Sequence, residues 1–233
     1  MRNLTRATTL ATAVLTAGLA LWAAPVGAAG ELIQPGAYSE TAVGGCTLNF
    51  VYDGTGANAG KTYVGTAAHC VKEIGDDVSL ASGEVFGDVA FLGDEDSAAP
   101  DFAFIEVRRE FLSRVSPAVK GYPAYPTGVT SPQDTTTGDT VQISGHGLGF
   151  GFTAVTQEKR FAVLGYDDDQ VHEVTGPIDF GDSGGPLVHV KSGKALGIVS
   201  RLCLGICSEE GPTVAGLLAK ANAAGFGVRL RTV

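Results

Sequence analysis

The stretch that decides the fold is Gly181-Asp182-Ser183-Gly184-Gly185-Pro186. A serine hydroxyl is a weak nucleophile unless a base removes its proton and nearby donors stabilise the oxyanion. Glycines on both sides of Ser183 allow a tight turn in which successive N–H groups point at one spot. The N–H groups of Gly181 and Ser183 are the expected pair. We therefore predict a nucleophilic Ser183; the alternative is a glycine-rich turn that merely contains a serine.

The same stretch also matches Gly-x-Ser-x-Gly, the nucleophile elbow of α/β-hydrolases, and chain order tests this alternative. That fold needs an acid and then a histidine after the serine, and a helix directly after it. The only histidine that follows Ser183 is His189, which lies in the strand-like run Leu187–Val190. Pro186 also interrupts any helix there. The α/β-hydrolase interpretation therefore fails.

A histidine and an aspartate stand before the serine in a second motif. Thr66-Ala67-Ala68-His69-Cys70 follows a strand-like run, and Asp101 opens the apolar run 101–105. TAAHC and GDSGGP together resemble the chymotrypsin family of serine proteases, most closely its bacterial, streptogrisin-like members, from Cys46 to the C-terminus. The resemblance implies that His69 takes the Ser183 proton and returns it to the leaving amine. Asp101 would hold the imidazole tautomer, and the amides of Gly181 and Ser183 would form the oxyanion hole.

The remaining histidines and several acids are weaker candidates for the triad. We expect a lone histidine in a strand-like run to be structural rather than the base. The rival acids are not followed by so clear a buried strand. These other candidates are His146, His172 and His189, and Asp88, Asp94 and Asp96.

Short β-branched and aromatic runs between glycine, proline and polar turns predict an all-β protein. The resemblance makes this two six-stranded antiparallel Greek-key barrels, at about residues 40–120 and 133–233, joined by the proline-rich stretch Tyr122–Pro132. Helical spacing in Thr213–Ala224 predicts one C-terminal helix, which Gly225 would end. The expected strands are Thr47–Tyr52, Lys61–Gly65, Phe102–Val107, Thr140–Ser144, Arg160–Leu164 and Ala195–Ser200.

The first thirty residues differ from the rest. Arg2 and Arg6 precede the apolar stretch Ala11–Ala24, and Val26-Gly27-Ala28 supplies a small-residue cleavage site. This order is typical of a secretory signal peptide. We expect residues 1–28 to be removed at about position 28–30 and residues 31–233 to form the secreted protease domain.

Export makes the four cysteines interpretable, because an oxidising compartment permits two disulfides. The resemblance implies a Cys46–Cys70 disulfide that pins the loop presenting His69. In animal family members, the cysteine that matches Cys207 is bonded to a cysteine across the specificity pocket. Asp179 stands at the position of that partner, so we pair Cys207 with Cys203 instead. The alternative, a zinc site, is weak because no histidine stands at ligand spacing from that last pair.

Composition limits the partners. The net charge of −9 would repel nucleic acid and anionic lipid, so we exclude both. We expect a monomer that acts on a peptide or protein substrate, with no membrane contact, cofactor or metal. The acidic runs Asp94–Asp96 and Asp167–Asp169 lack the spacing of a calcium loop and are interpreted as solvated turns.

The resemblance also locates the substrate groove. Family members lay the substrate backbone along the strand that Ala195–Ser200 matches, by strand addition. Arg201 replaces the usual tryptophan there, so the groove has an unusual rim. The specificity pocket would be built from Pro177–Phe180, Ser200–Leu202 and Glu209–Thr213, and it does not reveal the preferred residue. The expected substrate-binding residues are Phe180, Ser200, Arg201 and Leu202.

One partner stays open at this point. A buried Asp182 needs a counter-charge, for which Arg160 and the mature α-amine are both candidates. The function predicted from these residues is that of a secreted serine endopeptidase acting through an acyl-enzyme. The alternatives are a catalytically silent homologue that serves as a binding module, and an esterase.

Overall fold

The computed structural model describes residues 30–94, 96–147, 160–202 and 209–233. The chain divides into two compact units, Met1–Gly30 and Glu31–Val233. The first unit, which contains the expected signal peptide, lies outside the described residues except for Gly30. All strands and helices below belong to the second unit.

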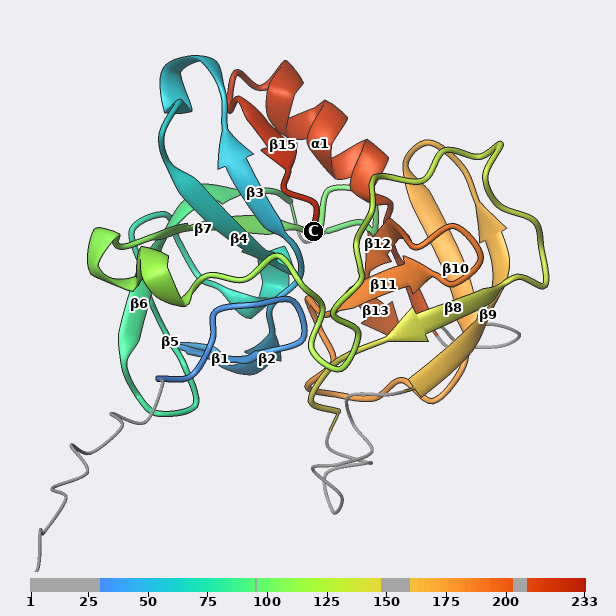
Figure 1. Cartoon of the computed structure of the whole chain (residues 1–233), viewed down its shortest axis with the longest axis horizontal. Helices are drawn as coiled ribbons and strands as arrows, with labels where there is room; N and C mark the ends of the chain where they lie inside the picture. The colour runs from blue at the N-terminus through green and yellow to red at the C-terminus, as the bar shows by residue number, and fades with distance from the viewer. Residues whose placement is uncertain (1–29, 95, 148–159, 203–208) are drawn as a thin grey trace, which may run out of the picture. The chain divides into compact units, whose positions relative to one another are not determined.

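Eight strands form the first sheet in the order β15-β3-β4-β7-β6-β5-β1-β2, with antiparallel neighbours. It is drawn in blue to green in Figure 1, except for the red β15 beside β3. The strands are β1 Tyr38–Thr41, β2 Gly44–Thr47, β3 Val51–Gly54, β4 Thr62–Thr66, β5 Asp77–Ser79, β6 Val85–Leu92, β7 Ala103–Val107 and β15 Val228–Leu230. Three short 3-10 helices accompany them: η1 Gly56–Asn58, η2 Ala68–Cys70 and η3 Arg109–Arg114.

Seven strands form the second sheet in the order β12-β11-β8-β9-β10-β14-β13, again antiparallel. They are β8 Thr140–Ile143, β9 Arg160–Asp167, β10 Val171–Thr175, β11 Pro186–His189, β12 Lys194–Ile198, β13 Arg201–Leu202 and β14 Glu209–Pro212. The helix α1 Val214–Ala223 follows β14. In Figure 1 it precedes β15, through which the chain returns to the first sheet.

The predicted mostly-β, two-barrel fold with one C-terminal helix is confirmed. The sheets contain eight and seven strands, where six each were expected. One reason is β15, which pairs Val228 with Gly54 and so belongs to the first sheet although it follows the second in sequence.

The expected strand Thr47–Tyr52 is divided into β2 and β3. Leu48 donates its N–H to Ala37, at 2.8 Å, whereas Asn49 donates to Gly65, at 2.7 Å. Because consecutive residues pair with different segments, the chain turns a corner here instead of continuing one ladder.

The helix has the ends that its sequence predicts. The Thr213 hydroxyl accepts a hydrogen bond from the Gly216 N–H at 3.1 Å, as an N-cap residue does. Gly225, with φ of +82°, follows the C-cap in the left-handed region that favours glycine. Val214, Leu217 and Ala221 are buried along one face.

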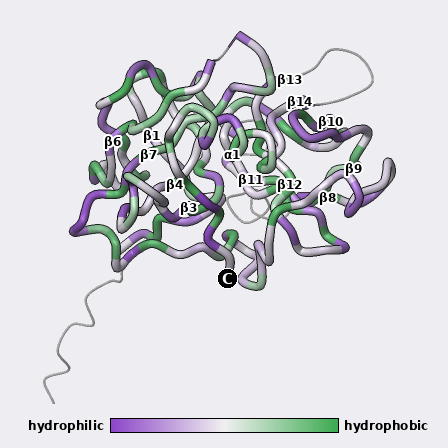
Figure 2. Tube along the Cα trace, turned by 90° about the horizontal axis from the view of Figure 1, so that it is seen from above, coloured by the Kyte–Doolittle hydropathy of each residue, from purple (hydrophilic) through white to green (hydrophobic). Residues whose placement is uncertain are grey.

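Three large buried clusters, and a small one around the Cys46–Cys70 disulfide, hold the described part of the unit together. One lies inside the first sheet around Val64, Phe86 and Ile105, and a second lies inside the second sheet around Leu164 and Leu187. Figure 2 shows hydrophobic segments in both sheets alternating with hydrophilic ones.

The third cluster joins the two sheets and α1. Its members are Phe50, Tyr52, Tyr63, Phe102, Phe104, Val119, Val188, Ala195, Ile198, Val214, Leu217, Ala221 and Val228. Burial of aromatic side chains is the largest apolar contribution available per residue, so this layer fixes one barrel against the other.

Candidate active site

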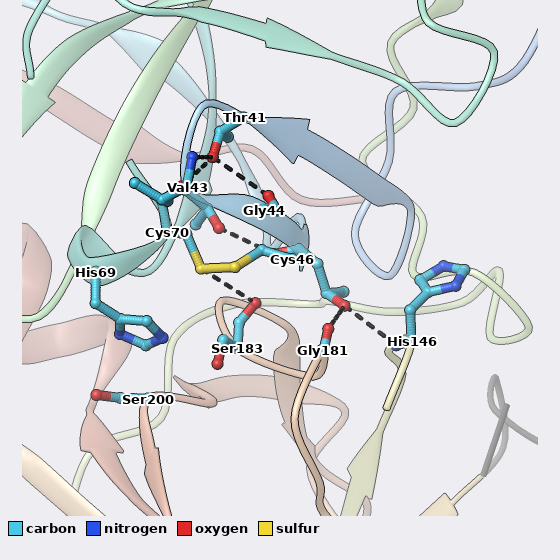
Figure 3. Close-up of a disulfide and its surroundings, with 12 residues drawn as sticks. Thr41, Val43, Gly44, Cys46, His69, Cys70, His146, Gly181, Ser183 and Ser200 are labelled. Atoms are coloured by element: carbon cyan, nitrogen blue, oxygen red, sulfur yellow. Dashed lines mark hydrogen bonds between the residues drawn. A yellow bond between two sulfur atoms is a disulfide. The ribbon is translucent and has the colours of Figure 1, made fainter. Parts of the chain in front are cut away.

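His69 is presented by η2, the single helical turn that follows β4. The adjacent Cys70 forms a disulfide with Cys46 on β2, as the resemblance implied, and this pairing is confirmed. The carbonyl of Cys70 also accepts a hydrogen bond from the Thr41 hydroxyl at 2.6 Å. Figure 3 shows this disulfide beside the His69 ring. The turn that carries His69 is therefore fixed covalently to the strand opposite it.

Asp101 lies two residues before the start of β7 and is fully buried. Its Oδ2 lies 2.8 Å from His69 Nδ1, and its Oδ1 accepts the His69 backbone N–H at 3.1 Å. The Ser200 hydroxyl donates a further hydrogen bond to Oδ2. This arrangement holds the imidazole with Nδ1–H towards the carboxylate and leaves Nε2 for a reacting group.

The pKa of Asp101 reflects two opposed influences. Burial is the largest and favours the neutral acid, which would raise the pKa. The hydrogen bond and charge of His69, with the hydrogen bond from Ser200, together outweigh it. The pKa of the Asp101 carboxyl therefore lies below its usual range, and the group is an anion at neutral pH.

Ser183 lies in the turn that precedes β11 and lines the same cavity as His69 and Asp101. Figure 3 shows Ser183 and Ser200 around the His69 ring. The Ser183 carbonyl accepts the Thr47 N–H at 2.9 Å, and this hydrogen bond ties the turn to the first sheet. Within the described residues, the Ser183 hydroxyl makes no hydrogen bond to His69. In unliganded enzymes this catalytic contact is often long and tightens when substrate binds.

The glycines of the turn have space only for hydrogen. Gly181 has φ of +99°, and a Cβ there would lie 2.5 Å from the His146 carbonyl oxygen. Gly184 has φ of +84°, and a Cβ there would lie 2.3 Å from the Thr66 hydroxyl. Across the ranges that the structure describes, the N–H groups of Gly181 and Ser183 donate to no acceptor. They are available to an oxyanion.

Asp182 is fully buried beside Ser183, and its partner is Arg160 on β9. The guanidinium binds both carboxylate oxygens; Nη1 lies 2.6 Å from Oδ2 and Nη2 contacts Oδ1. The N–H groups of Gly147 and Asp179 donate to the same carboxylate at 2.8 and 3.0 Å. The choice that the sequence left open is therefore decided in favour of Arg160. A bidentate Arg–carboxylate pair satisfies the buried charge without a new N-terminus.

A cavity of about 780 Å³ lies between the sheets in front of these residues. The four expected substrate-binding residues, Phe180, Ser200, Arg201 and Leu202, all line it. Phe180 and Leu202 are 69% and 43% exposed, so they offer apolar surface at its rim. The segment Glu209–Thr213, expected to form a pocket wall, does not line the cavity.

Residues 50–198 match the family of trypsin-like peptidase domains. The chain belongs to this family. It is thus a serine protease, a hydrolase, as the motifs predicted. No significant match was found among curated proteins.

Solved structures resemble the peptidase in fold at low sequence identity. Thermobifida fusca Protease A is 20% identical, with a TM-score of 0.61 over 87% of this chain and 100% of that one. A glutamic acid specific serine protease is 19% identical, with a TM-score of 0.60 over 85% of this chain and 100% of that one. Cellulomonas bogoriensis chymotrypsin is 17% identical, with a TM-score of 0.57 over 86% of this chain and 99% of that one.

The other histidines of the peptidase have structural partners. His146 Nε2 lies 3.0 Å from the Gly36 carbonyl oxygen. His189 Nε2 lies 3.0 Å from Asp139 Oδ2, and its Nδ1 lies 2.8 Å from the Ser192 hydroxyl. Neither contacts Ser183 or Asp101.

His172 belongs to a group that the sequence analysis missed. Its Nε2 lies 3.0 Å from Glu209 Oε2, and Glu209 Oε1 accepts the Ser200 N–H at 2.9 Å. Ser200 in turn contacts Asp101. No local pattern gives this group away, because His172 and Glu209 are 37 residues apart.

Three further features concern the second disulfide, metal binding and membrane contact. Cys203 and Cys207 lie outside the described residues. Within 30–94, 96–147, 160–202 and 209–233, no three His, Cys, Asp or Glu side chains are grouped to hold a metal ion. No helix in that part of the chain is long and apolar enough to span a membrane.

Proposed function

We propose that the peptidase is a secreted serine endopeptidase with Ser183 as nucleophile, His69 as general base and acid, and Asp101 as the orienting carboxylate. One observation carries the proposal. Buried Asp101 receives both the backbone N–H and Nδ1 of His69, in a cavity that Ser183 also lines. This leaves His69 Nε2 as the base on the cavity side.

The chemistry is acyl transfer. Ser183 Oγ attacks the scissile carbonyl carbon while its proton passes to His69 Nε2, and the amides of Gly181 and Ser183 stabilise the oxyanion. The C–N bond then breaks as His69 returns the proton to the leaving amine, which leaves an ester on Ser183. Water attacks the ester through the same base. The acid is released as the proton returns to Ser183 Oγ.

A peptide substrate would enter as an added strand. Arg201 and Leu202 form β13, which ends the strand order of the second sheet among the described residues, and Ser200 directly precedes it. A strand at the edge of a sheet presents main-chain donors and acceptors that an extended peptide can pair with. Phe180 and Leu202 would then flank the bound side chains.

A fluorophosphonate probe tests the nucleophile. The folded wild-type protein should be labelled on Ser183, and Ser183→Ala should lose both labelling and peptide hydrolysis while it keeps its thermal unfolding midpoint. Ser192→Ala is a matched control, because Ser192 also bonds a histidine, His189, away from the cavity. It should label like the wild type. An unlabelled folded wild type would instead indicate the silent binding module, and turnover of esters without peptides would indicate an esterase.

Secretion has its own test. The full chain, expressed in a secreting host, should appear in the medium with a new N-terminus at about residues 29–31, as a signal peptide of this length requires. Retention of an intact N-terminus inside the cell would contradict the proposal.

A further inference from the structure

Ser200 uses both of its donors on buried carboxylates. Its N–H donates to Glu209 Oε1 at 2.9 Å, and its hydroxyl donates to Asp101 Oδ2. All three residues are at most 6% exposed. The residue that contacts the triad acid is thus held from behind by a second acid.

Glu209 is itself held by His172. The imidazole Nε2 lies 3.0 Å from Glu209 Oε2, and both side chains are fully buried. His172 Nδ1 has no hydrogen-bond partner in the described part of the chain. Because Nε2 faces a carboxylate, it carries the hydrogen, and the pair leaves one carboxylate oxygen free for the Ser200 N–H.

Two glycines on the flanking strands make room for this pair. A Cβ on Gly197 of β12 would lie 2.3 Å from the His172 ring. A Cβ on Gly211 of β14 would lie 2.6 Å from Glu209 Oε1 and 2.3 Å from the Ile198 carbonyl oxygen. The pair therefore occupies a closely fitted site between these strands and cannot shift without moving the backbone.

We propose that Glu209, fixed by His172, is a positioning residue for the catalytic machinery: it holds the Ser200 backbone so that the Ser200 hydroxyl stays aligned on Asp101. This inference rests on the proposed function. Ser200 lies between β12 and β13, outside regular strand pairing. Without Glu209 its N–H loses its acceptor, and the chain can move to satisfy that N–H elsewhere. Asp101 would then lose a donor that lowers its pKa.

A second histidine–carboxylate pair, in which the histidine is buried and the carboxylate is partly exposed, provides the contrast. His189 and Asp139 lie 3.0 Å apart, and His189 is fully buried like His172. His189 also contacts the Ser192 hydroxyl, and Asp139 also accepts the Thr136 N–H at 2.9 Å. None of these contacts involves Asp101 or Ser200. If such pairs act only on stability, disrupting either pair should have the same consequences for the active site.

The experiment measures the hydrogen bond between His69 and Asp101 directly. In a Ser183→Ala background, the proton on His69 Nδ1 should give a far-downfield ¹H NMR signal, since it lies in a charge-assisted bond. We expect Glu209→Ala to shift or broaden this signal and Asp139→Ala to leave it unchanged. This readout needs no catalysis. It therefore decides the inference even if fluorophosphonate labelling shows that the proposed function fails.

Peptide hydrolysis kinetics, measured in variants that keep Ser183, give the second readout. We expect Glu209→Ala to lower kcat/KM about tenfold and Glu209→Gln to recover most of it, because the amide oxygen still accepts from Ser200. Asp139→Ala should stay within about twofold of the wild type. Should Glu209→Ala fail to fold, His172→Leu, which keeps Glu209 but removes its partner, should alter the same NMR signal. An unaltered signal in the folded variant, or an equal effect of Asp139→Ala, would overturn the inference.

Discussion

Asp101 and Asp182 are both fully buried, yet their partners are of different kinds. Asp101 binds His69, whose side chain is 33% exposed to the cavity. Asp182 binds Arg160, whose side chain is only 6% exposed. Imidazole gains and loses a proton near neutral pH, whereas guanidinium stays charged. Under the proposed function, a buried carboxylate therefore supports proton transfer at Asp101, whereas at Asp182 it forms a permanent ion pair.

The largest effect is expected from Asp101→Asn, which disrupts the Asp101–His69 pair. An amide at this position would favour the wrong imidazole tautomer, so kcat should fall about 10⁴-fold while the fold is retained. Peptide hydrolysis and thermal unfolding measured side by side would check this. A variant that retains a tenth or more of the wild-type kcat would show that Asp101 is not the orienting acid.

Arg160→Met is expected to remove the second pair, Arg160–Asp182. It leaves Asp182 buried without its counter-charge, which should cost about 3–5 kcal/mol in the free energy of unfolding. Arg108→Met provides the control, because Arg108 pairs with Asp88 at the surface and its loss should cost far less. Urea titrations measure both. Equal losses in the two variants would contradict the role given to Arg160.

Removing the disulfide is expected to weaken the His69 side. Cys46 and Cys70 are 24 residues apart in sequence, so the double change to Ala should cost about 3 kcal/mol by chain entropy. Activity should fall as well, because Cys70 adjoins His69. The measurements are urea unfolding and kcat/KM at a temperature where the variant stays folded. Unchanged stability would show that η2 is held without the covalent link.

The smallest effect that we expect is a change with pH in the contribution of Asp101 to the free energy of unfolding. The pKa of Asp101 is lowered in the folded state, so its contribution to stability is present above its unfolded pKa of about 4. That contribution is lost as pH falls through the lower, folded value. The free energy of unfolding of Asp101→Asn should consequently depend less on pH below about 4 than that of the wild type. Urea titrations at several pH values would test this, and parallel curves would contradict it.

Much of the fold followed from local sequence. Thr213 and Gly225 marked the ends of α1 because capping depends on a few neighbouring residues. The hexapeptide around Ser183 required glycine at positions whose backbone the structure shows to be left-handed or crowded. These are short-range constraints, so a single sequence carries them.

The expected strand Thr47–Tyr52 shows where local reasoning fails. Its apolar residues are buried as expected, but Leu48 and Asn49 pair with different segments. All six residues of this segment are buried, so its side-chain pattern does not distinguish a corner from one continuous strand. Only the partner strands decide between them.

By itself, the sequence predicted the family, the triad candidates and the class of fold, because motifs, their order and periodicity can be read along a single chain. The Cys46–Cys70 pair came from the family resemblance that these motifs carry. Tertiary structure alone decided that Arg160 pairs with Asp182 and that Glu209 reaches Ser200. It also decided that β15 returns to the first sheet. The physical reason is that these contacts depend on how two sheets pack around a shared apolar layer. Residues far apart in the chain carry no local pattern that specifies such a contact.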